Sequence, residues 1–544
     1  MHSQDGFRRL RIVDLPEEIL REIFDHLTDE DYYDDEAGFF DPPNTDSDEF
    51  RALQALRLTC RLFSGTASPM LSPILRVRIE PDSLDRVDQL TRNPLIAAGV
   101  KTMQVSVAYR PKEIAEDPSR YSTVHARVLD KLERACDWYT EFVDQMPDDE
   151  LEGDEDDIKK AMYTYYAMSS AWSKWSESES GAKALEPGHD DPYIKLISQC
   201  FTEYRQKHDA QHRLLTSGTF VSTLATCMSR LRCLRALSFL DEADISPEDF
   251  TDRSNLTILA NSPTKLRDLL IAPHTWNLLE ELKPSPSILP VTLLWQLPLA
   301  LQSSHTRPLA LYVQRIPIST PNLALLQPPV ESLSLPIKEF HIRTGSHCEI
   351  RHHHNPELSH LAAYLSWVLS SDEPTLEELY LDFYGLKLND GYLSHRGASW
   401  PSRYPSLGAA LAHVRGEKLR DLALSEITFT EAELVAFFKG CGNRLKSVRM
   451  YDVGVTNGGA WAEAFDVLRE KGMSSREDCD VYLTTLCGGE FGGGERGVEG
   501  EGEGEEDEEG EEDEDEPEEP LCEAVWRYVL GELQENPLRG LERS

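Results

Sequence analysis

The first seventy residues carry apolar side chains at helical spacing. Apolar residues recur every three or four positions, at Leu15, Ile19, Leu20, Ile23, Phe24 and Leu27. Pro16 suits the first turn of a helix, and Glu17 and Glu18 then lie where the helix dipole favours acids. The pattern predicts an amphipathic helix over 15–27, with charged residues on its other side.

A second helical pattern follows an acidic, proline-containing stretch over 28–49. Its apolar face holds Leu53, Leu56, Cys60, Phe63 and Ala67. Arg57 and Arg61 fall away from this face, and the pattern ends near Ser68 because the residue before a proline disfavours helical geometry. We therefore predict a second helix over 53–67.

The rest of the chain repeats a short strand signature. Apolar residues at relative positions 0, 3 and 5 occur at Ile74/Val77/Ile79, Val100/Met103/Val105, Leu234/Leu237/Phe239, Leu266/Leu269/Ile271, Ile337/Phe340/Ile342, Leu376/Leu379/Leu381, Leu419/Leu422/Leu424 and Leu445/Val448/Met450. Alternation over the last three positions is what a strand with one buried face requires. Helical patterns over 358–369, 430–438 and 460–468 separate the later strands. The fold is therefore predicted to be α/β, built from loosely spaced strand–helix units.

Segments outside these units differ in composition. The gap between the second and third signatures predicts a helical insertion over about 122–231, whose many Trp and Tyr residues we expect to form a helical core rather than a ligand cage. The proline-rich stretch 283–336 is expected to loop over the surface. The Gly/Glu-rich tract 488–520 is expected to be disordered, and an apolar pattern over 521–533 predicts a helix that caps the last unit.

Charge constrains the partners. The 544 residues include 96 Asp and Glu against 55 Lys and Arg, a net charge of −41, and 16 of the acids lie in Glu499–Glu519. Such a chain repels phosphate backbones and anionic lipid, so we expect no nucleic acid and no membrane among its partners, and basic protein surfaces to be attracted instead. No run approaches the roughly 18 to 20 apolar residues of a membrane span. The ten cysteines contain no Cys-x-x-Cys pair, so we expect reduced thiols in a cytoplasmic or nuclear protein.

Reactive groups do not form a recognisable catalytic motif. The sequence has no Gly-x-Ser-x-Gly nucleophile elbow, no phosphate-binding P-loop and no His-Glu-x-x-His zinc helix. Metal-type ligands crowd together once, at His341, His347, Cys348, His352, His353, His354 and His360. Their spacing fits no paired set of zinc ligands, so a surface loop is the favoured interpretation and zinc binding the alternative. We expect no metal, no cofactor and no catalytic residue.

A resemblance to the F-box is carried by two segments, LPEEILREIFDHL and ALRLTCRLFSGTASPML. The F-box is the helical module by which receptor subunits bind the Skp adaptor of cullin-based ubiquitin ligases. The Leu-Pro start, the Ile-Leu and Ile-Phe pairs and the Leu-x-Cys-Arg-x-Phe segment match, whereas the insertion over 28–49 departs from the family. The later units resemble an irregular leucine-rich-repeat solenoid that lacks the usual Asn or Cys after the strand. The implied division is an F-box over 1–70, a solenoid over 71–487, the tract 488–520 and a C-terminal part over 521–544.

The resemblance implies a non-catalytic receptor that binds an unknown protein substrate and, through the Skp adaptor, a cullin. The adaptor-facing and core positions map onto Leu15, Pro16, Ile19, Leu20, Ile23 and Phe24, and then onto Leu58, Cys60 and Phe63. We expect Ile19 and Ile23 to pack inside the module, and Leu15 and Pro16 to contact the adaptor. Whether the substrate is phosphorylated is left open, with phosphate-pairing candidates at Arg267, Arg343, Arg420 and Arg449.

Three alternatives stay open. The chain is a scaffold outside any ligase that binds a basic partner through its acidic tract, or its strands belong to an ordinary α/β domain, or it is an enzyme without a recognisable motif. The scaffold predicts that deleting Glu499–Glu519 removes salt-sensitive binding, whereas the receptor predicts that this deletion spares adaptor binding.

Overall fold

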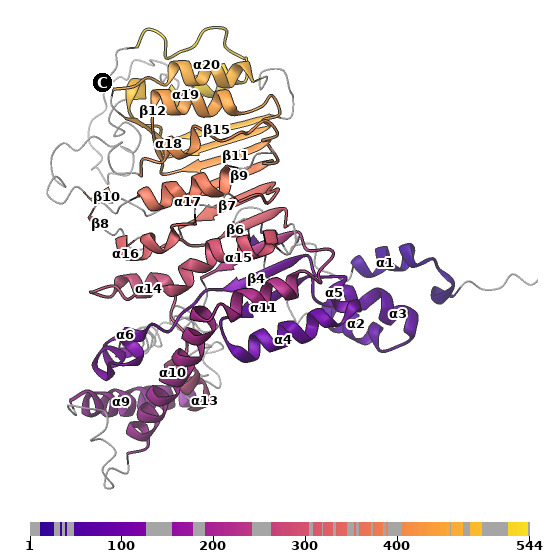
Figure 1. Ribbon diagram of the computed structural model, residues 1–544, viewed down its shortest axis with the longest axis vertical. Coiled ribbons are helices and arrows are strands. Elements are labelled where there is room, and N and C mark those ends of the chain that lie inside the picture. The colour runs from indigo at the N-terminus through magenta and orange to yellow at the C-terminus, as the bar shows by residue number, and fades with distance from the viewer. Residues whose placement is uncertain are drawn as a thin grey trace, which may run out of the picture.

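The structure, a computed structural model, describes residues 11–26, 33–34, 39–40, 48–126, 155–177, 191–241, 263–303, 308–317, 319–329, 333–344, 353–354, 358–370, 374–383, 388–389, 405–456, 458–471, 479–491 and 521–541. A nine-stranded parallel sheet runs through it, with helices along one face (Figure 1). A small helical module and a helical insertion extend from the N-terminal end of this stack. Within these residues, no helix combines the length and the apolar character needed to cross a bilayer.

The N-terminal module consists of short helices. They are η1 (Ile12–Asp14), α1 (Glu17–Asp25), α2 (Asp48–Arg57), α3 (Arg61–Ala67) and η2 (Ser68–Leu71). The first predicted helix is confirmed by α1, but the second is divided, because Cys60 has extended backbone angles of φ −156° and ψ 166°. The Thr59 hydroxyl donates to the Leu56 carbonyl at 2.8 Å and so satisfies the end of α2 before α3 begins.

The order of strands in the central sheet follows the chain. The strands are β3 (Ile74–Arg78), β4 (Thr102–Ser106), β5 (Ala236–Leu240), β6 (Ala310–Val313), β7 (Glu339–Arg343), β9 (Glu378–Asp382), β11 (Asp421–Ser425), β13 (Ser447–Tyr451) and β15 (Asp480–Thr484). Each strand is parallel to the next in this series. The predicted α/β class is confirmed, as are seven of the eight predicted strands.

Two sequence predictions about this region are wrong. The signature at 266–271 forms helix α13 (Pro263–Ile271), because Leu266, Leu269 and Leu270 also satisfy the spacing of a buried helical face. The stretch 283–336 is not a surface loop, since it supplies β6 and the buried side of helix α15 (Leu293–Ser303). The sequence also fails to indicate β6 and β15, and β6 is buried on both faces, so no alternation marks it.

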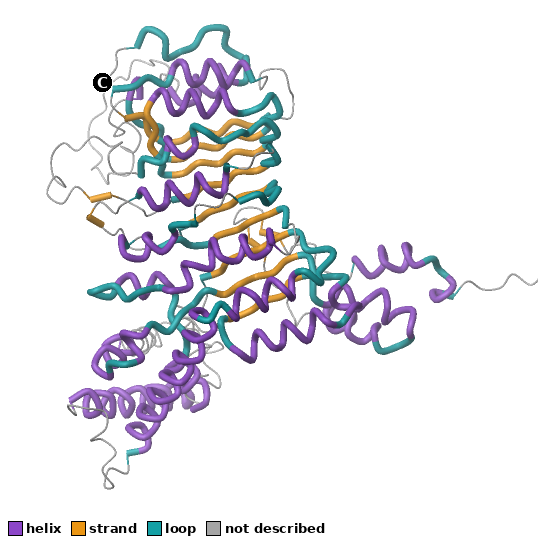
Figure 2. The backbone as a smooth tube through the Cα atoms, in the orientation of Figure 1, coloured by secondary structure: helices purple, strands orange, loops and turns teal. Residues whose placement is uncertain are grey.

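Helices lie along one face of the sheet (Figure 2). Those of the stack are α4 (Pro81–Arg92), α5 (Pro94–Ala97), α11 (Thr219–Met228), α15, α17 (Ser359–Leu369), α18 (Gly408–Leu411), α19 (Glu431–Gly440) and α20 (Ala462–Glu470). The predicted helices over 358–369, 430–438 and 460–468 are thereby confirmed. The smaller elements are α6 (Lys112–Ala115), α14 (Trp276–Glu281), η6 (Leu289–Thr292), α16 (Thr320–Leu323), η7 (Ala324–Leu326), η10 (Gly489–Phe491), β1 (Tyr33–Asp34), β2 (Phe39–Phe40), β8 (His353–His354), β10 (Leu388–Asn389), β12 (Thr428–Thr430) and β14 (Gly454–Thr456).

The main core lies between the sheet and these helices. In β11 and β13 the inward side chains Leu422, Leu424, Val448 and Met450 are buried, and the residues between them are half-buried or exposed. Burying an aliphatic side chain of this size contributes about 1.5–3 kcal/mol. Each unit is stabilised mainly by its neighbours, because one strand and one helix cannot enclose a core alone.

The strands end in a repeated corner. Glu426, Asp452 and Thr485 each follow a strand directly and have positive φ angles of 54°, 52° and 52°. The Glu426 N–H donates to the Tyr451 carbonyl at 3.0 Å, and the Asp452 N–H donates to the Thr484 carbonyl at 3.1 Å. Backbone hydrogen bonds therefore connect neighbouring units at this corner. The Asn side chains that connect units in regular leucine-rich repeats are not found at these positions of the sequence.

The helical insertion contains two long helices, α9 (Glu155–Glu177) and α10 (Pro192–Thr216). Its aromatic residues form a core, since Trp172, Trp175 and Tyr204 pack around Tyr121 with ring centroids 6.0, 6.0 and 5.4 Å away. This arrangement agrees with the predicted helical core. Trp138 and Tyr139 lie outside the described residues.

The opposite end of the stack is covered by α21 (Leu521–Val529), the predicted C-terminal helix. This helix contacts α20 and β15. Asp466 on α20 accepts hydrogen bonds from the Tyr528 hydroxyl at 2.6 Å and the Asn536 amide at 2.8 Å. The prediction of disorder over 488–520 is wrong for its first residues, because Gly489–Phe491 form η10 with Gly489 buried. The remainder, 492–520, lies outside the described residues.

Candidate functional site

The N-terminal module has its own small core. Leu20, Phe24, Leu53, Phe63 and Ala67 are buried together. Phe24 and Phe63 meet edge to face, with ring centroids 5.3 Å apart. This cluster is separate from the main core, so the module is held together by its own contacts.

Part of the outer surface of the module is apolar. Its exposed residues include Ile12, Val13, Pro16, Ile19, Ile23, Leu58 and Leu62. Exposure is 79% for Leu58, 41% for Ile19 and 38% for Ile23. Pro16, Ile19 and Ile23 follow one another at three- and four-residue spacing and therefore form one stripe along α1.

The expectation that Ile19 and Ile23 pack inside the module is wrong. The apolar arc of α1 is wider than the module core can cover, and the core buries the half that holds Leu20 and Phe24. Leu15 is half-buried against that core and Pro16 is exposed at the start of α1. Of the second-segment candidates, Leu58 and Cys60 are exposed and Phe63 is buried.

A backbone contact fixes the module against the stack. A Cβ atom on Gly99 would lie 1.7 Å from the Pro69 carbonyl oxygen, so only glycine permits this approach of η2 to the turn before β4. Helices η2 and α5 also pack together. The apolar stripe is therefore held in a defined orientation relative to the sheet.

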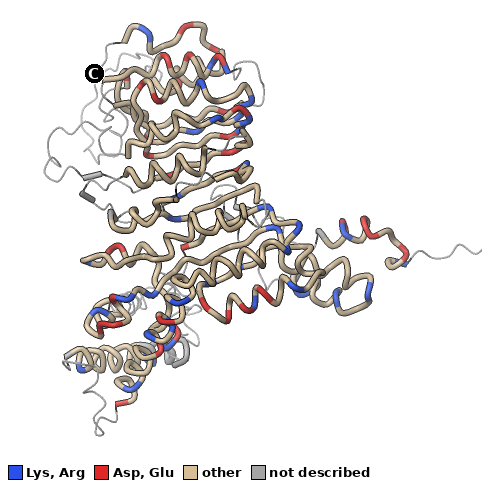
Figure 3. Tube along the Cα trace, viewed as in Figure 1, with Lys and Arg blue, Asp and Glu red and all other residues tan. Residues whose placement is uncertain are grey.

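The second candidate surface is the face of the sheet that points away from the helices. Its rows follow from the strand register. One row runs through Glu339, Glu378, Asp421, Ser447 and Asp480, and the next runs through Tyr312, His341, Tyr380, Ala423, Arg449 and Tyr482. Neighbouring strands are about 4.8 Å apart, so side chains within a row are direct neighbours. Figure 3 shows charged residues of both signs along the edge where these strands begin.

Three carboxylates, Glu339, Glu378 and Asp421, form what we call the acidic row. Partial burial raises the pKa of Glu378 to about 7, and the negative charges of Glu339 and Asp421 add to the rise. Arg420 partly opposes it, with its Nη2 atom 3.5 Å from Glu378 Oε1. The acidic row therefore carries more negative charge than its neighbouring cations compensate.

Aromatic rings flank the acidic row. His341 lies between Tyr312 and Tyr380, with ring centroids 4.8 and 5.7 Å away. Burial lowers the pKa of His341 to about 4, so it supplies no positive charge at neutral pH. Farther along the face, the rings of Tyr451 and Tyr482 lie in contact with centroids 5.2 Å apart and planes tilted by 40°, and these residues are 37% and 50% exposed. We refer to Tyr380, Tyr451 and Tyr482 as the tyrosine group.

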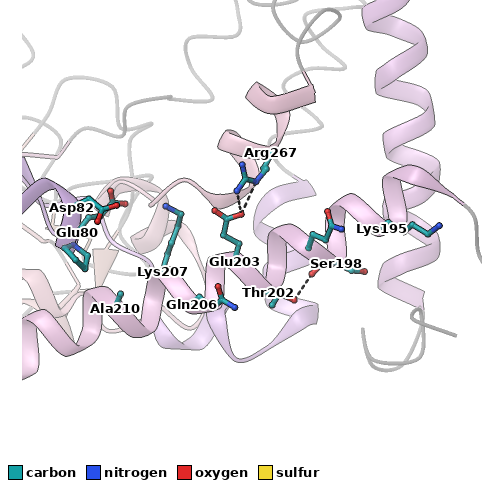
Figure 4. Close-up of a pocket in the computed structure, with 12 residues that line it drawn as sticks. Glu80, Asp82, Lys195, Ser198, Thr202, Glu203, Gln206, Lys207, Ala210 and Arg267 are labelled. Atoms are coloured by element: carbon teal, nitrogen blue, oxygen red, sulfur yellow. Dashed lines mark hydrogen bonds and ion pairs between the residues drawn. The ribbon is translucent and has the colours of Figure 1, made fainter. Parts of the chain in front are cut away.

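A polar cavity of about 730 Å³ lies between α10, α13 and the start of α4 (Figure 4). Glu203 accepts two hydrogen bonds from Arg267, at 3.0 and 2.6 Å, across one wall. Charges of both signs line the rest, including Glu80, Asp82 and Lys207. Its open, mixed surface favours no particular ligand.

A buried polar cluster joins the insertion to the sheet. The Arg110 guanidinium pairs with Glu80 at 3.1 Å and donates to the Ile271 carbonyl at 2.8 Å. Burial lowers the pKa of His125 to about 4 and holds the pKa of His274 well below its usual value. Among the described residues, Arg110 Nη1, His125 Nε2, His274 Nε2 and the Tyr204 hydroxyl have no hydrogen-bond partner.

The candidate metal ligands and the buried thiols can be placed within the described residues. No three His, Cys, Asp or Glu side chains there converge as a metal site. Of the predicted histidine group, His341 lies on the sheet, His360 lies on α17, and β8 consists of His353 and His354. His347, Cys348 and His352 lie outside the described residues. Burial raises the pKa of Cys200, Cys441 and Cys487 to about 12, which keeps these thiols protonated and unreactive.

Comparison with known proteins gives no match, whether the chain is compared with protein-family models, with curated proteins or with solved structures. The fold and the two surfaces described above are therefore the basis for assigning a function. They define a mixed α/β protein with a helical module that exposes an apolar stripe at one end of a parallel sheet, and with a polar sheet face beyond it.

The sequence does not reveal the acidic row. Its members are separated by dozens of residues, and phrases such as LEELYL and LRDLAL indicate only a charged outer face. The strand register brings them together, and no local signal in one sequence specifies that register.

Proposed function

We propose that the chain is a substrate-recognition subunit of an SCF-type cullin ubiquitin ligase. The N-terminal module acts as an F-box that binds the Skp adaptor, and the stack, as an irregular leucine-rich-repeat solenoid, holds a protein substrate. The chain positions its substrate and contributes no catalytic group.

The observation that supports this proposal most is the exposed apolar stripe on a module with a separate core. A module of this size normally buries its large apolar residues, whereas Leu58 is 79% exposed and Ile19 and Ile23 face outward. Helical surfaces of this kind bind protein partners through aliphatic anchors that enter an apolar groove. The resemblance of LPEEILREIFDHL and ALRLTCRLFSGTASPML to the F-box names the adaptor as that partner.

The sharpest test replaces Ile19 and Leu58 with lysine. Both side chains are exposed, so the module should fold normally, while each lysine would have to lose its hydration in an apolar groove. We expect capture of purified Skp adaptor to fall by at least about 100-fold, as for the loss of two interface anchors. Glu18→Lys is the matched control, because Glu18 is exposed on the other side of α1.

Substitution of Leu15 and Pro16 by alanine is a milder form of the same test. Adaptor capture should fall, while thermal unfolding should change only by the modest loss of packing of Leu15 against the module core.

Retained capture in the Ile19/Leu58 variant would reject the F-box assignment. If deletion of Glu499–Glu519 abolished all partner binding and the module variants did not, the scaffold alternative would be favoured.

A further inference from the structure

The sheet face that points away from the helices is open toward the C-terminal end of the stack. In β13 and β15, Arg449, Tyr451, Asp480 and Tyr482 are exposed, whereas the alternating residues are buried against the helices. In β11 the small residue Ala423 lies between Tyr380 and Arg449 in the register. The open face therefore combines rings, a small central residue and, at the start of the strands, the acidic row.

The charges on this face favour a cationic partner. Among the described residues, no ion pair engages Glu339 or Asp421, although the Tyr312 hydroxyl donates to Glu339. Partial burial raises the pKa of Glu378 to about 7, and the negative charges of Glu339 and Asp421 at the adjacent register positions add to the rise. An incoming cation would relieve this repulsion.

Most of the arginines considered for phosphate binding are already paired. Arg267 is bonded to Glu203, Arg343 lies 3.4 Å from Asp382, and Arg420 lies 3.1 Å from Glu377. Arg449 is the exception among the four candidates. A phosphorylated segment would therefore have to compete with carboxylates for most of its partners.

We propose that this face binds an arginine- or lysine-rich segment of a protein partner, with cations placed on the acidic row and against the rings of the tyrosine group. Carboxylates pair with the cations, and the rings attract them through their π faces. The inference rests on the proposed function only in identifying this partner as the ligase substrate.

The test uses the full chain and a fluorescent peptide of alternating arginine and glycine. Combined substitution of Glu339→Gln, Glu378→Gln and Asp421→Asn should weaken binding about tenfold, the loss expected for three partly exposed ion pairs. The matched control is Asp85→Asn, Asp209→Asn and Glu470→Gln, which removes the same charge from exposed positions on α4, α10 and α20. We expect the control to change binding by less than about twofold, because screening weakens distant charges.

Tyr380→Leu tests the rings without changing the charge. It should weaken binding severalfold, and circular dichroism should show that each variant is folded. Binding of the peptide to the unmodified chain should strengthen from pH 6 to pH 8, since the cation must displace the proton on Glu378. Glu378 faces Glu339 and His341 on β7, Asp421 on β11 and Arg420 directly before β11.

Two results would overturn the inference. Equal losses in the two triple variants would show diffuse attraction to the net charge of the chain. Preference for a phosphoserine peptide, lost in Arg449→Met, would show an anionic partner instead. The adaptor is absent from this assay, so a failure here leaves the adaptor test intact, and a failure of adaptor capture leaves this result intact.

Discussion

Strands β4 to β6 and strands β11 to β15 belong to one sheet but differ in the burial of their second face. Every residue of β4, β5 and β6 is buried, whereas β11, β13 and β15 alternate between buried and accessible residues. Next to β4 lies the buried cluster around Arg110, and the open face lies at the other end. The same kind of strand is therefore part of the interior where other elements cover both of its faces, and presents an accessible row of side chains where only the helices cover it.

The largest expected difference between the two regions is in the free energy of unfolding that is lost when one arginine in each region is replaced by alanine. Arg110→Ala should lower the free energy of unfolding by about 3–5 kcal/mol, because it empties a buried site, leaves the Ile271 carbonyl unpaired and leaves Glu80 with Arg78 alone. Arg449→Ala on the open face should change it by no more than about 0.5 kcal/mol. Urea unfolding monitored by tryptophan fluorescence measures both. Similar values for the two variants would remove the distinction.

Within β11, a buried residue and its accessible neighbour should likewise differ in how much their substitution lowers the free energy of unfolding. Leu424→Ala should cost about 3 kcal/mol, because it opens a cavity between the sheet and the helices. Ala423→Ser, one residue earlier on the open face, should be close to neutral. The midpoints of urea unfolding would contradict the assigned register if Ala423→Ser were the more damaging change.

The two regions should respond to pH in opposite directions. His125 is neutral when folded, with a pKa of about 4 against 6.5 when unfolded, so its contribution is lost as the pH falls from about 6.5 to 4. This loss amounts to about 2 kcal/mol between pH 7.5 and pH 5. Glu378 acts oppositely: its folded pKa is raised to about 7, so its contribution is greatest below its unfolded pKa and is lost as the pH rises toward 7.

Variants separate these two effects. His125→Phe should remove part of the acid sensitivity, and Glu378→Gln should remove the loss toward neutral pH. Unfolding midpoints at pH 5 and pH 7.5 for the three proteins provide the measurement. Identical pH profiles for the unmodified chain and His125→Phe would show that His125 is not buried as a neutral ring.

The smallest expected loss of stability comes from a substitution at the start of α19. Thr430 accepts from the Glu433 N–H at 3.3 Å, and Glu433 accepts from the Thr430 N–H at 2.8 Å, which forms a capping box. Thr430→Ala should cost about 1 kcal/mol, and Thr430→Ser should restore most of it. Thermal unfolding resolves the difference, and an unchanged midpoint in Thr430→Ala would show that the cap adds nothing to the regular region.

Sequence patterns predicted the regular region best. Alternation identified β9, β11 and β13, because each buries one face only. The same rule missed β6, which is buried on both faces, and misassigned Leu266–Ile271, where helical and strand spacing coincide.

The candidate surfaces were predicted less completely. The sequence located the N-terminal module but placed Ile19 and Ile23 inside it, since an apolar arc does not show which half the neighbouring helices cover. The acidic row could not be inferred at all, because it depends on the register of three strands far apart in the chain.

The contact of α21 with β15 bears on self-assembly. β15 is the terminal strand of the sheet, paired with β13 on one side, and α21 lies against it. A chain truncated before Leu521 would present an uncovered strand edge to another molecule, and parallel edges of this kind promote end-to-end joining into oligomers. The C-terminal helix thus ends the series of stacked units by lying against the last strand of the described sheet.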